Sequence, residues 1–210
     1  AAALGVEASD TQQGLLGESL GCYAEARDSL FIQNYGGAFT NNPFCQATSW
    51  DFDGQDIFKR AVAGMVGASN QVLDDMGLSV ADIDLVVPHQ ANSRIIDAVG
   101  RKLGVPTDRV FVNVERYGNM SAATVLVALV EAIEQGYVRA FSKILLPAFG
   151  AGLTWNSHLV QWGDRITPLA ISDIELPPCD ETALELIAPY LTQQRRQLQS
   201  QIESVQQADL

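Results

Sequence analysis

The stretch Val86-Val87-Pro88-His89-Gln90-Ala91-Asn92 constrains the fold of this chain more than any other. The largely apolar run from Ile83 to Val87 predicts a buried strand, which ends at Pro88, and a helix is predicted to begin at Ala91. Because α/β proteins place their chemistry at the carboxyl ends of strands, a catalytic or ligand-binding role is expected for His89. A histidine that simply packs in the turn fits the same pattern, so this stretch alone leaves both interpretations open.

Strand and helix patterns alternate along most of the chain. The periodicity predicts helices over 53–77, 92–103 and 121–133, and strands over 1–8, 15–23, 83–87, 110–114, 143–149 and 153–162. Residues 29–49 are rich in Gly, Asn and aromatic residues and predict a loop. This order predicts a layered α/β domain with a buried, mostly parallel core and an antiparallel last strand. The helix over 121–133 is apolar nearly all round, so we expect it to be deeply buried.

The composition changes after Trp162, which predicts two regions. Residues 1–164 form the α/β domain, and residues 165–210 form an extension with an irregular linker and a Gln-rich helix from about 181. Its sparse apolar stripe fits a solvated tail or one that docks on the domain or a partner. A length of 210 residues suits one sizeable domain or half of a larger two-part fold.

Composition excludes several classes of function. The net charge of −12 argues against nucleic acid as a partner, and no apolar run reaches the roughly 20 residues of a membrane span. Three cysteines without C-x-x-C spacing predict neither a disulfide framework nor a metal site, which favours the cytoplasm. No signal peptide is recognised, and the first residues resemble a strand already under way. We therefore expect a piece of a longer protein.

Three polar turns follow predicted strands or adjoin buried elements, at His89–Asn92, Tyr117–Ser121 and Phe149–Gly152. If the strands are neighbours in one sheet, these turns converge on one pocket. A histidine and an asparagine aimed at one oxygen would stabilise an enolate or oxyanion. The glycines would let backbone amides approach a ligand closely.

The segments 87–95, 116–124 and 148–155 resemble three motifs of β-ketoacyl-acyl-carrier-protein synthase III, and Phe52–Lys59 resembles the start of that family's long helix. The motifs occur in the family's order and spacing, and the resemblance covers about residues 1–164. It implies the carboxyl-terminal half of a thiolase-like layered α/β fold with a mixed sheet and buried and covering helices, followed by the helical tail. It also implies decarboxylative Claisen condensation of an acyl group from acyl-CoA with malonyl-acyl carrier protein in fatty acid biosynthesis, without a cofactor.

The resemblance assigns roles to individual residues. His89 and Asn119 match the histidine and asparagine that bind the malonyl thioester carbonyl and promote decarboxylation. A neutral imidazole with Nε2–H and an amide NH₂ are suitable donors for the developing enolate oxygen. The expected substrate-binding residues are a phenylalanine at the malonyl site, two positions beside the pantetheine arm and the glycines of the acyl-pocket loop: Phe149, Gly54, Asn92, Gly150 and Gly152. The glycine between the last two in the family is Ala151 here, so we expect a narrower or stiffer wall.

The family's nucleophilic cysteine has no counterpart in this chain. Its position lies well over a hundred residues before the histidine, whereas only 88 residues precede His89. Cys22, Cys45 and Cys179 lie in the wrong segments and lack the small-residue helix start that lowers a thiol pKa. We therefore expect that the isolated chain is not acylated and that an amino-terminal half carrying the cysteine completes the enzyme, as a homodimer.

Basic residues near the expected pocket match positions where the family docks its acidic carrier protein. They are Lys59, Arg94, Arg101 and Lys102. In a chain of net charge −12 this is a local excess of positive charge, although a solvated basic helix face fits Arg101 and Lys102 equally well. Two other functions stay open: a related condensing or acyl-transferring enzyme of secondary metabolism, and a non-catalytic partner half-domain.

Overall fold

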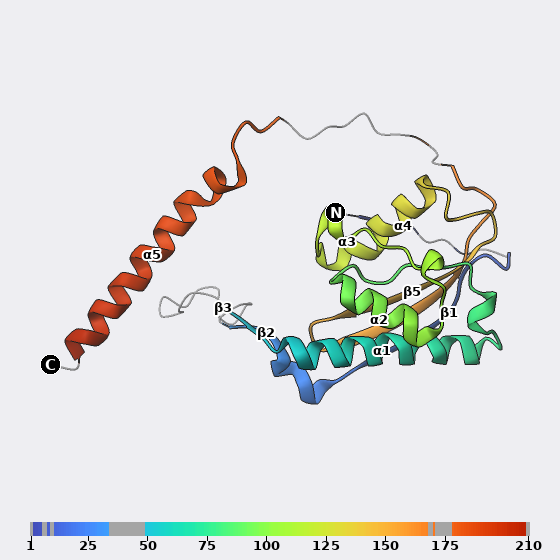
Figure 1. Ribbon diagram of the computed structural model, residues 1–210, viewed down its shortest axis with the longest axis horizontal. Coiled ribbons are helices and arrows are strands. Elements are labelled where there is room, and N and C mark those ends of the chain that lie inside the picture. Colours follow the sequence, from blue (N-terminus) through green and yellow to red (C-terminus); the bar gives the residue numbers. More distant parts are fainter. Residues whose placement is uncertain are drawn as a thin grey trace. The chain divides into compact units, whose positions relative to one another are not determined.

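Figure 1 shows a computed structural model of the chain, which describes residues 2–5, 8, 11–33, 49–167, 170 and 178–208. The chain divides into two compact units. The first comprises residues 1–33 and 49–169, and the second comprises residues 34–48 and 170–210. Every residue predicted for the site lies in the first unit, so the site can be described within that unit alone.

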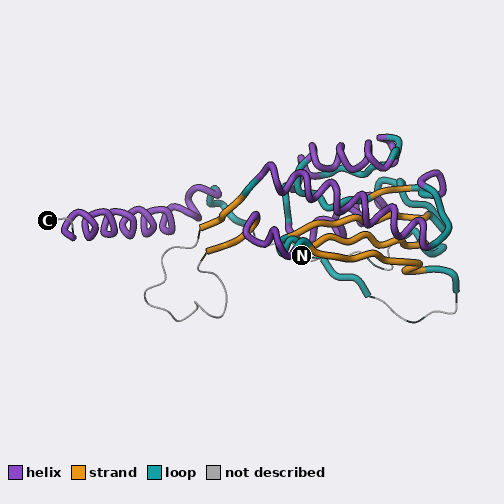
Figure 2. The backbone as a smooth tube through the Cα atoms, turned by 90° about the horizontal axis from the view of Figure 1, so that it is seen from below, coloured by secondary structure: helices purple, strands orange, loops and turns teal. Residues whose placement is uncertain are grey.

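A four-stranded mixed sheet forms the framework of the first unit, with its strands side by side in Figure 2. Its order is β1 (Gly14–Cys22), β6 (Thr154–Gln161), β5 (Lys143–Gly150) and β4 (Leu85–Val86). β6 is antiparallel to both β1 and β5, and only β4 and β5 are parallel. The predictions of an antiparallel last strand and of a mixed sheet are confirmed, whereas the prediction of a mostly parallel core was wrong. The three residues between β5 and β6 allow only an antiparallel return.

Helices cover both faces of the sheet in the first unit (Figure 1). α1 (Gly54–Asp75) and α2 (Ser93–Leu103) pack on one face, and α4 (Thr124–Glu134) packs on the other. The long helix begins where the sequence predicts, because Asp53 Oδ1 accepts hydrogen bonds from the backbone N–H of Gln55 and Asp56 at 3.1 and 3.0 Å.

The remaining elements are short or lie outside this sheet. They are β2 (Leu30–Gln33), β3 (Ser49–Phe52), α3 (Val114–Tyr117), α5 (Ala183–Ala208) and four 3₁₀ turns at Ala24–Ser29, Val80–Asp82, Thr107–Arg109 and Ser121–Ala123.

Close packing holds α1 against the sheet. A Cβ atom on Gly64 would lie 2.8 to 2.9 Å from three atoms of Trp155, closer than real contacts allow. Glycine at this position therefore lets the helix approach β6. Beside this contact lies an apolar core that includes Met65, Val72 and Leu159, all nearly inaccessible to solvent. A second apolar cluster between the sheet and α4 includes Leu85 and Ala128.

Two predicted strands are not found in the part of the chain that the structure describes. Residues 2–5 and 8 of the first are exposed and have no regular secondary structure. In the second, predicted over 110–114, Val110 makes an isolated bridge to Val86, and α3 begins at Val114. The Gln90 side chain bonds the backbone O of Phe111 and N–H of Asn113, so a side chain occupies the place of a neighbouring strand.

Two further expectations were only partly right. β2 and β3 pair antiparallel at the ends of the predicted 29–49 loop, and residues 34–48, with Cys45, lie outside the described residues. The helix predicted over 121–133 begins as a 3₁₀ turn, and its burial is incomplete, since Val130 is 54% exposed.

The second unit contains α5, as the sequence predicts for this region. Leu184 and Tyr190 are strongly exposed on it, and Pro189 lies within the helix. The domain boundary predicted after residue 164 stays a prediction. Among the described residues, no helix has the length and apolar content to cross a bilayer.

Candidate functional site

A cavity of about 900 Å³ in the first unit adjoins the carboxyl ends of β4 and β5. It brings together seven of the residues predicted for the site: Gly54, His89, Asn92, Arg94, Asn119, Phe149 and Gly150. The three polar turns therefore converge as expected. Gly152, Lys59, Arg101 and Lys102 are not among the residues that line it.

The amide of Asn119 is oriented by its own turn. Its Oδ1 accepts a hydrogen bond from the backbone N–H of Ser121 at 2.8 Å, and Ser121 adopts a left-handed conformation with φ of 55°. Because the oxygen is engaged by the backbone, the Nδ2 donors are the part of the amide left for a ligand. Sequence analysis placed Ser121 in the motif but assigned it no role.

His89 is held by its backbone and by its ring. Its N–H donates to Pro147 O at 2.9 Å, which ties the turn to β5. Its Nδ1 lies 2.5 Å from Thr124 Oγ1, and Thr124 is completely buried at the start of α4. Burial lowers the pKa of the imidazole, which favours its neutral form. Thr124 is a second residue whose role sequence analysis missed.

Gln90 fastens the His89 turn to the segment that leads toward Asn119. This side chain is completely buried. Its Nε2 donates to Pro88 O and Phe111 O at 2.8 and 3.1 Å, and its Oε1 accepts from Asn113 N at 2.9 Å. All three bonds are to backbone groups, and backbone partners leave no residue pattern in the sequence. The only sign of this role of Gln90 in the sequence was a polar residue that follows a buried strand.

Asn113 and Arg116 carry this connection on to α4. Asn113 Nδ2 donates to Glu131 Oε2 at 2.8 Å, and Arg116 pairs with the other oxygen of the same carboxylate. Glu131 is only 6% exposed, and the partners of its two carboxylate oxygens compensate for its burial. The hydrogen-bonded path from the His89 turn therefore reaches α4, which begins five residues after Asn119.

Four of the five predicted substrate-binding residues form parts of the cavity wall, and Gly152 is the exception. Phe149 is 8% exposed near the end of β5. Asn92 caps α2, with its Oδ1 accepting from Arg94 N at 2.9 Å. Ala151 lines the cavity in place of the family's glycine. Gly152 has a φ of 137°, and a Cβ there would meet Thr154 Cγ2 at 2.7 Å, so the loop conformation at this position favours glycine.

The predicted basic residues are spread along two helices. Arg94 lies at the start of α2 and lines the cavity. Arg101 and Lys102 lie in the last turn of α2, about 10 to 12 Å farther along the helix at a rise of about 1.5 Å per residue. Lys59 is exposed near the start of α1.

No cysteine is among the described residues that line the cavity. Cys22 and Cys179 are exposed free thiols. Within the described ranges, no group of three or more His, Cys, Asp or Glu side chains is arranged to hold a metal ion.

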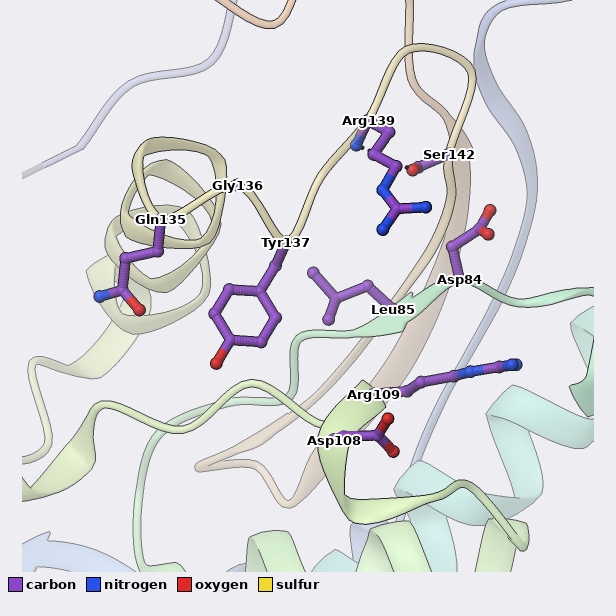
Figure 3. A pocket seen from close by; sticks show the side chains of 9 residues that line it. All are labelled: Asp84, Leu85, Asp108, Arg109, Gln135, Gly136, Tyr137, Arg139 and Ser142. Carbon is purple, nitrogen blue, oxygen red and sulfur yellow. Dashed lines mark hydrogen bonds between the residues drawn. The ribbon is translucent and has the colours of Figure 1, made fainter.

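Figure 3 shows a second cavity, of about 490 Å³, which lies beside the start of β4. Its walls include Asp84, Arg109, Tyr137 and Arg139. It contains none of the residues predicted for the site. In addition, Asp84 precedes β4, whereas His89 follows that strand. The candidate chemistry therefore belongs to the larger cavity.

Comparison with known proteins shows which family this chain resembles and how much of its relatives' length it covers. The model of the family described as 3-oxoacyl-(acyl-carrier-protein (ACP)) synthase III C terminal matches residues 73–162. The β-ketoacyl-(acyl-carrier-protein) synthase III 2 of Vibrio cholerae is 47% identical over 194 residues, which are 90% of this chain and 53% of that protein. The chain thus spans about half the length of this relative.

Solved structures give the same picture. The 3-oxoacyl-(acyl carrier protein) synthase III of Pseudomonas aeruginosa is 34% identical with a TM-score of 0.68, over 77% of this chain and 48% of that one. A priming β-ketosynthase from a polyketide biosynthetic pathway is 33% identical with a TM-score of 0.66, over 74% of this chain and 47% of that one. The thiolase-like layered fold is thereby confirmed.

Proposed function

This chain belongs to the β-ketoacyl-acyl-carrier-protein synthase III family and corresponds to its carboxyl-terminal half, and we propose that it supplies the decarboxylation half of the active site of such an enzyme. The reaction joins an acyl group from acyl-CoA to malonyl-acyl carrier protein in fatty acid biosynthesis. The proposal includes no cofactor or metal.

One observation carries this proposal: His89 and Asn119 line one cavity, and the hydrogen bonds to Thr124 Oγ1 and Ser121 N orient both side chains. The Asn119 amide is left with two N–H donors, and a neutral His89 protonated on Nε2 offers a third. Donors held in place in this way stabilise negative charge on an oxygen without first having to reorganise.

The chemistry follows from those donors. The thioester oxygen of the malonyl group binds between His89 and Asn119. The bond between the malonyl carboxylate and its α-carbon breaks, carbon dioxide leaves, and the electron pair of that bond forms the thioester enolate. The enolate carbon then attacks the carbonyl of an acyl-cysteine thioester, and the cysteine thiolate leaves. Phe149, which lines the same cavity, supplies apolar surface that keeps water away from the enolate.

The cysteine of this scheme comes from an amino-terminal half. The chain spans about half of its relatives, and none of the described residues that line the cavity is a cysteine. Exposed apolar side chains on the first unit, such as Val130 on α4 and Leu20 on β1, offer surface that another half would bury. We further propose that the complete enzyme is a homodimer in the cytoplasm and that the isolated chain is inactive.

The decisive experiment separates decarboxylation from acylation in the complete enzyme. His89→Ala is expected to lower decarboxylation of malonyl-acyl carrier protein by about 10²- to 10³-fold, the usual effect of deleting one oxyanion donor. Transfer of the acyl group from acyl-CoA to the cysteine should persist. A variant that loses acylation but decarboxylates normally would overturn the assignment.

The same experiment tests the non-catalytic alternative. If the chain only scaffolds a partner, His89→Ala leaves both partial reactions unchanged. A 210-residue chain that is monodisperse and unfolds cooperatively by itself would also count against the proposed half-enzyme, since exposed sheet and helix faces favour association.

The similarity to the polyketide priming β-ketosynthase supports a second candidate, a condensing enzyme of secondary metabolism with the same donor pair. The two candidates differ in the acyl group and in the carrier protein that they use. Turnover measured with carrier proteins of fatty acid and of polyketide synthesis distinguishes them, and a preference of tenfold or more for the polyketide carrier would favour the second.

A further inference from the structure

The side chain of Thr124 is the hydrogen-bond partner of the His89 ring, at the wall of the same cavity. Its Oγ1 lies 2.5 Å from His89 Nδ1 and 3.0 Å from the carbonyl oxygen of Ser121. Thr124 is completely buried, so its hydroxyl has no access to bulk water. The hydroxyl carries one proton, and it can therefore donate to only one of these two neighbours at a time.

The direction of that single proton determines the tautomer of His89. If Thr124 donates to Ser121 O, then Nδ1 must carry the imidazole proton, and Nε2 has only a lone pair. If Thr124 donates to Nδ1, then Nε2 carries the proton and becomes a hydrogen-bond donor. The proposed decarboxylation needs the second arrangement, since an enolate oxygen requires donors.

The backbone makes the second arrangement available. Ser121 O already accepts a hydrogen bond from the backbone N–H of Thr124. When the hydroxyl turns to His89, this carbonyl therefore keeps a partner, and no buried backbone group is left unsatisfied. In the first arrangement the same carbonyl would have two donors, while the donor for an enolate would be missing.

From this geometry we infer that Thr124 is a positioning residue that holds His89 as the Nε2-protonated tautomer by donating its hydroxyl to Nδ1. The inference rests on the proposed function, which requires His89 to be a donor. It extends that function by explaining how one neutral imidazole is kept in the orientation and the tautomer that the reaction needs. Partners of this kind, one step removed from the reacting atoms, typically change activity by about 10- to 100-fold.

The tautomer can be measured directly. The chain contains two histidines, His89 and His158, so selective ¹⁵N labelling of histidine gives two spin systems from this chain, which His158→Gln assigns. Correlation of ring ¹⁵N with ring ¹H should identify Nε2 as the protonated nitrogen of His89. In Thr124→Val, which keeps the shape but removes the hydroxyl, the spectrum should shift toward the Nδ1-protonated form or a mixture. A wild-type His89 protonated on Nδ1 would overturn the inference.

Kinetics of the complete enzyme provide the second readout. Thr124→Val should lower malonyl decarboxylation by about 10- to 100-fold and spare acylation of the cysteine, and Thr124→Ser should restore most of the rate. Thr192→Val removes an exposed hydroxyl that bonds Ala188 O on α5, and it controls for the substitution itself. Equal loss in Thr124→Val and Thr124→Ser would mean that the methyl group matters and would refute the inference.

The two readouts separate failure of the inference from failure of the proposed function. If His89→Ala decarboxylates normally, the proposed function fails, whatever the tautomer. If His89→Ala is inactive while Thr124→Val keeps both the rate and the tautomer of the wild type, only the role of Thr124 fails.

Discussion

Replacement of Gln90 by leucine tests whether hydrogen bonds to the backbone hold the His89 turn in place. Leucine fills nearly the same space but cannot bond Pro88 O, Phe111 O or Asn113 N. All three residues are buried, and Gln90 itself is completely inaccessible. A buried polar group without a partner costs about 1 to 3 kcal/mol, so three of them predict a loss of about 3 kcal/mol or more in the free energy of unfolding.

Urea unfolding of the complete enzyme, followed by tryptophan fluorescence, measures this loss. We expect a lower midpoint at unchanged slope, together with a lower melting temperature. Gln71→Leu is the matched control, because the exposed Gln71 side chain bonds Asp75 on the same helix. It should change the free energy of unfolding by less than about 0.5 kcal/mol. A loss below about 1 kcal/mol for Gln90→Leu would refute the reasoning.

Three further predictions concern packing, pH and the cavity mouth. Gly64→Ala should lower the free energy of unfolding by about 1 to 3 kcal/mol, because the added Cβ meets Trp155. Gly67→Ala on the same helix should raise it by about 0.5 to 1 kcal/mol, because the Cβ added there meets no other atom. Equal effects of the two substitutions in thermal melts would contradict the packing argument. Because burial lowers the pKa of His89, the unfolded chain binds a proton at higher pH than the folded one, so the contribution to stability is complete above about pH 6.5 and declines as the pH falls toward the folded-state value. His89→Gln should flatten that decline in urea titrations, and an unchanged slope would exclude His89 as its source. Arg94→Glu should raise the KM for malonyl-acyl carrier protein several-fold and spare that for acyl-CoA in steady-state assays, because it reverses a charge on the cavity wall; a parallel rise in both values would indicate a damaged site.

Local patterns in the sequence were sufficient to predict α1 and α2 and to select the candidate site residues. α1 and α2 begin within a residue of their polar caps Asp53 and Asn92, because a helix start depends on groups only two or three positions apart. The turns at His89, Asn119 and Phe149 could be recognised for a similar reason, since each combines a buried element with small and polar residues in a short segment. Their resemblance to one family then supplied the chemistry.

Strand partners and side-chain orientation depend on residues far apart in the chain, and only the tertiary structure determined them. Residues 110–114 look like a strand locally, but the side chain of Gln90 takes the hydrogen bonds that a neighbouring strand would have made. In the sequence, nothing distinguishes Thr124 from the other residues of its apolar helix. In the folded chain its hydroxyl lies 2.5 Å from Nδ1 of His89, a residue 35 positions earlier. The sequence by itself therefore determined which groups could perform the chemistry, because side-chain chemistry and local turns are encoded position by position. The tertiary structure decided how those groups are held, because their hydrogen-bond partners come from other segments of the chain.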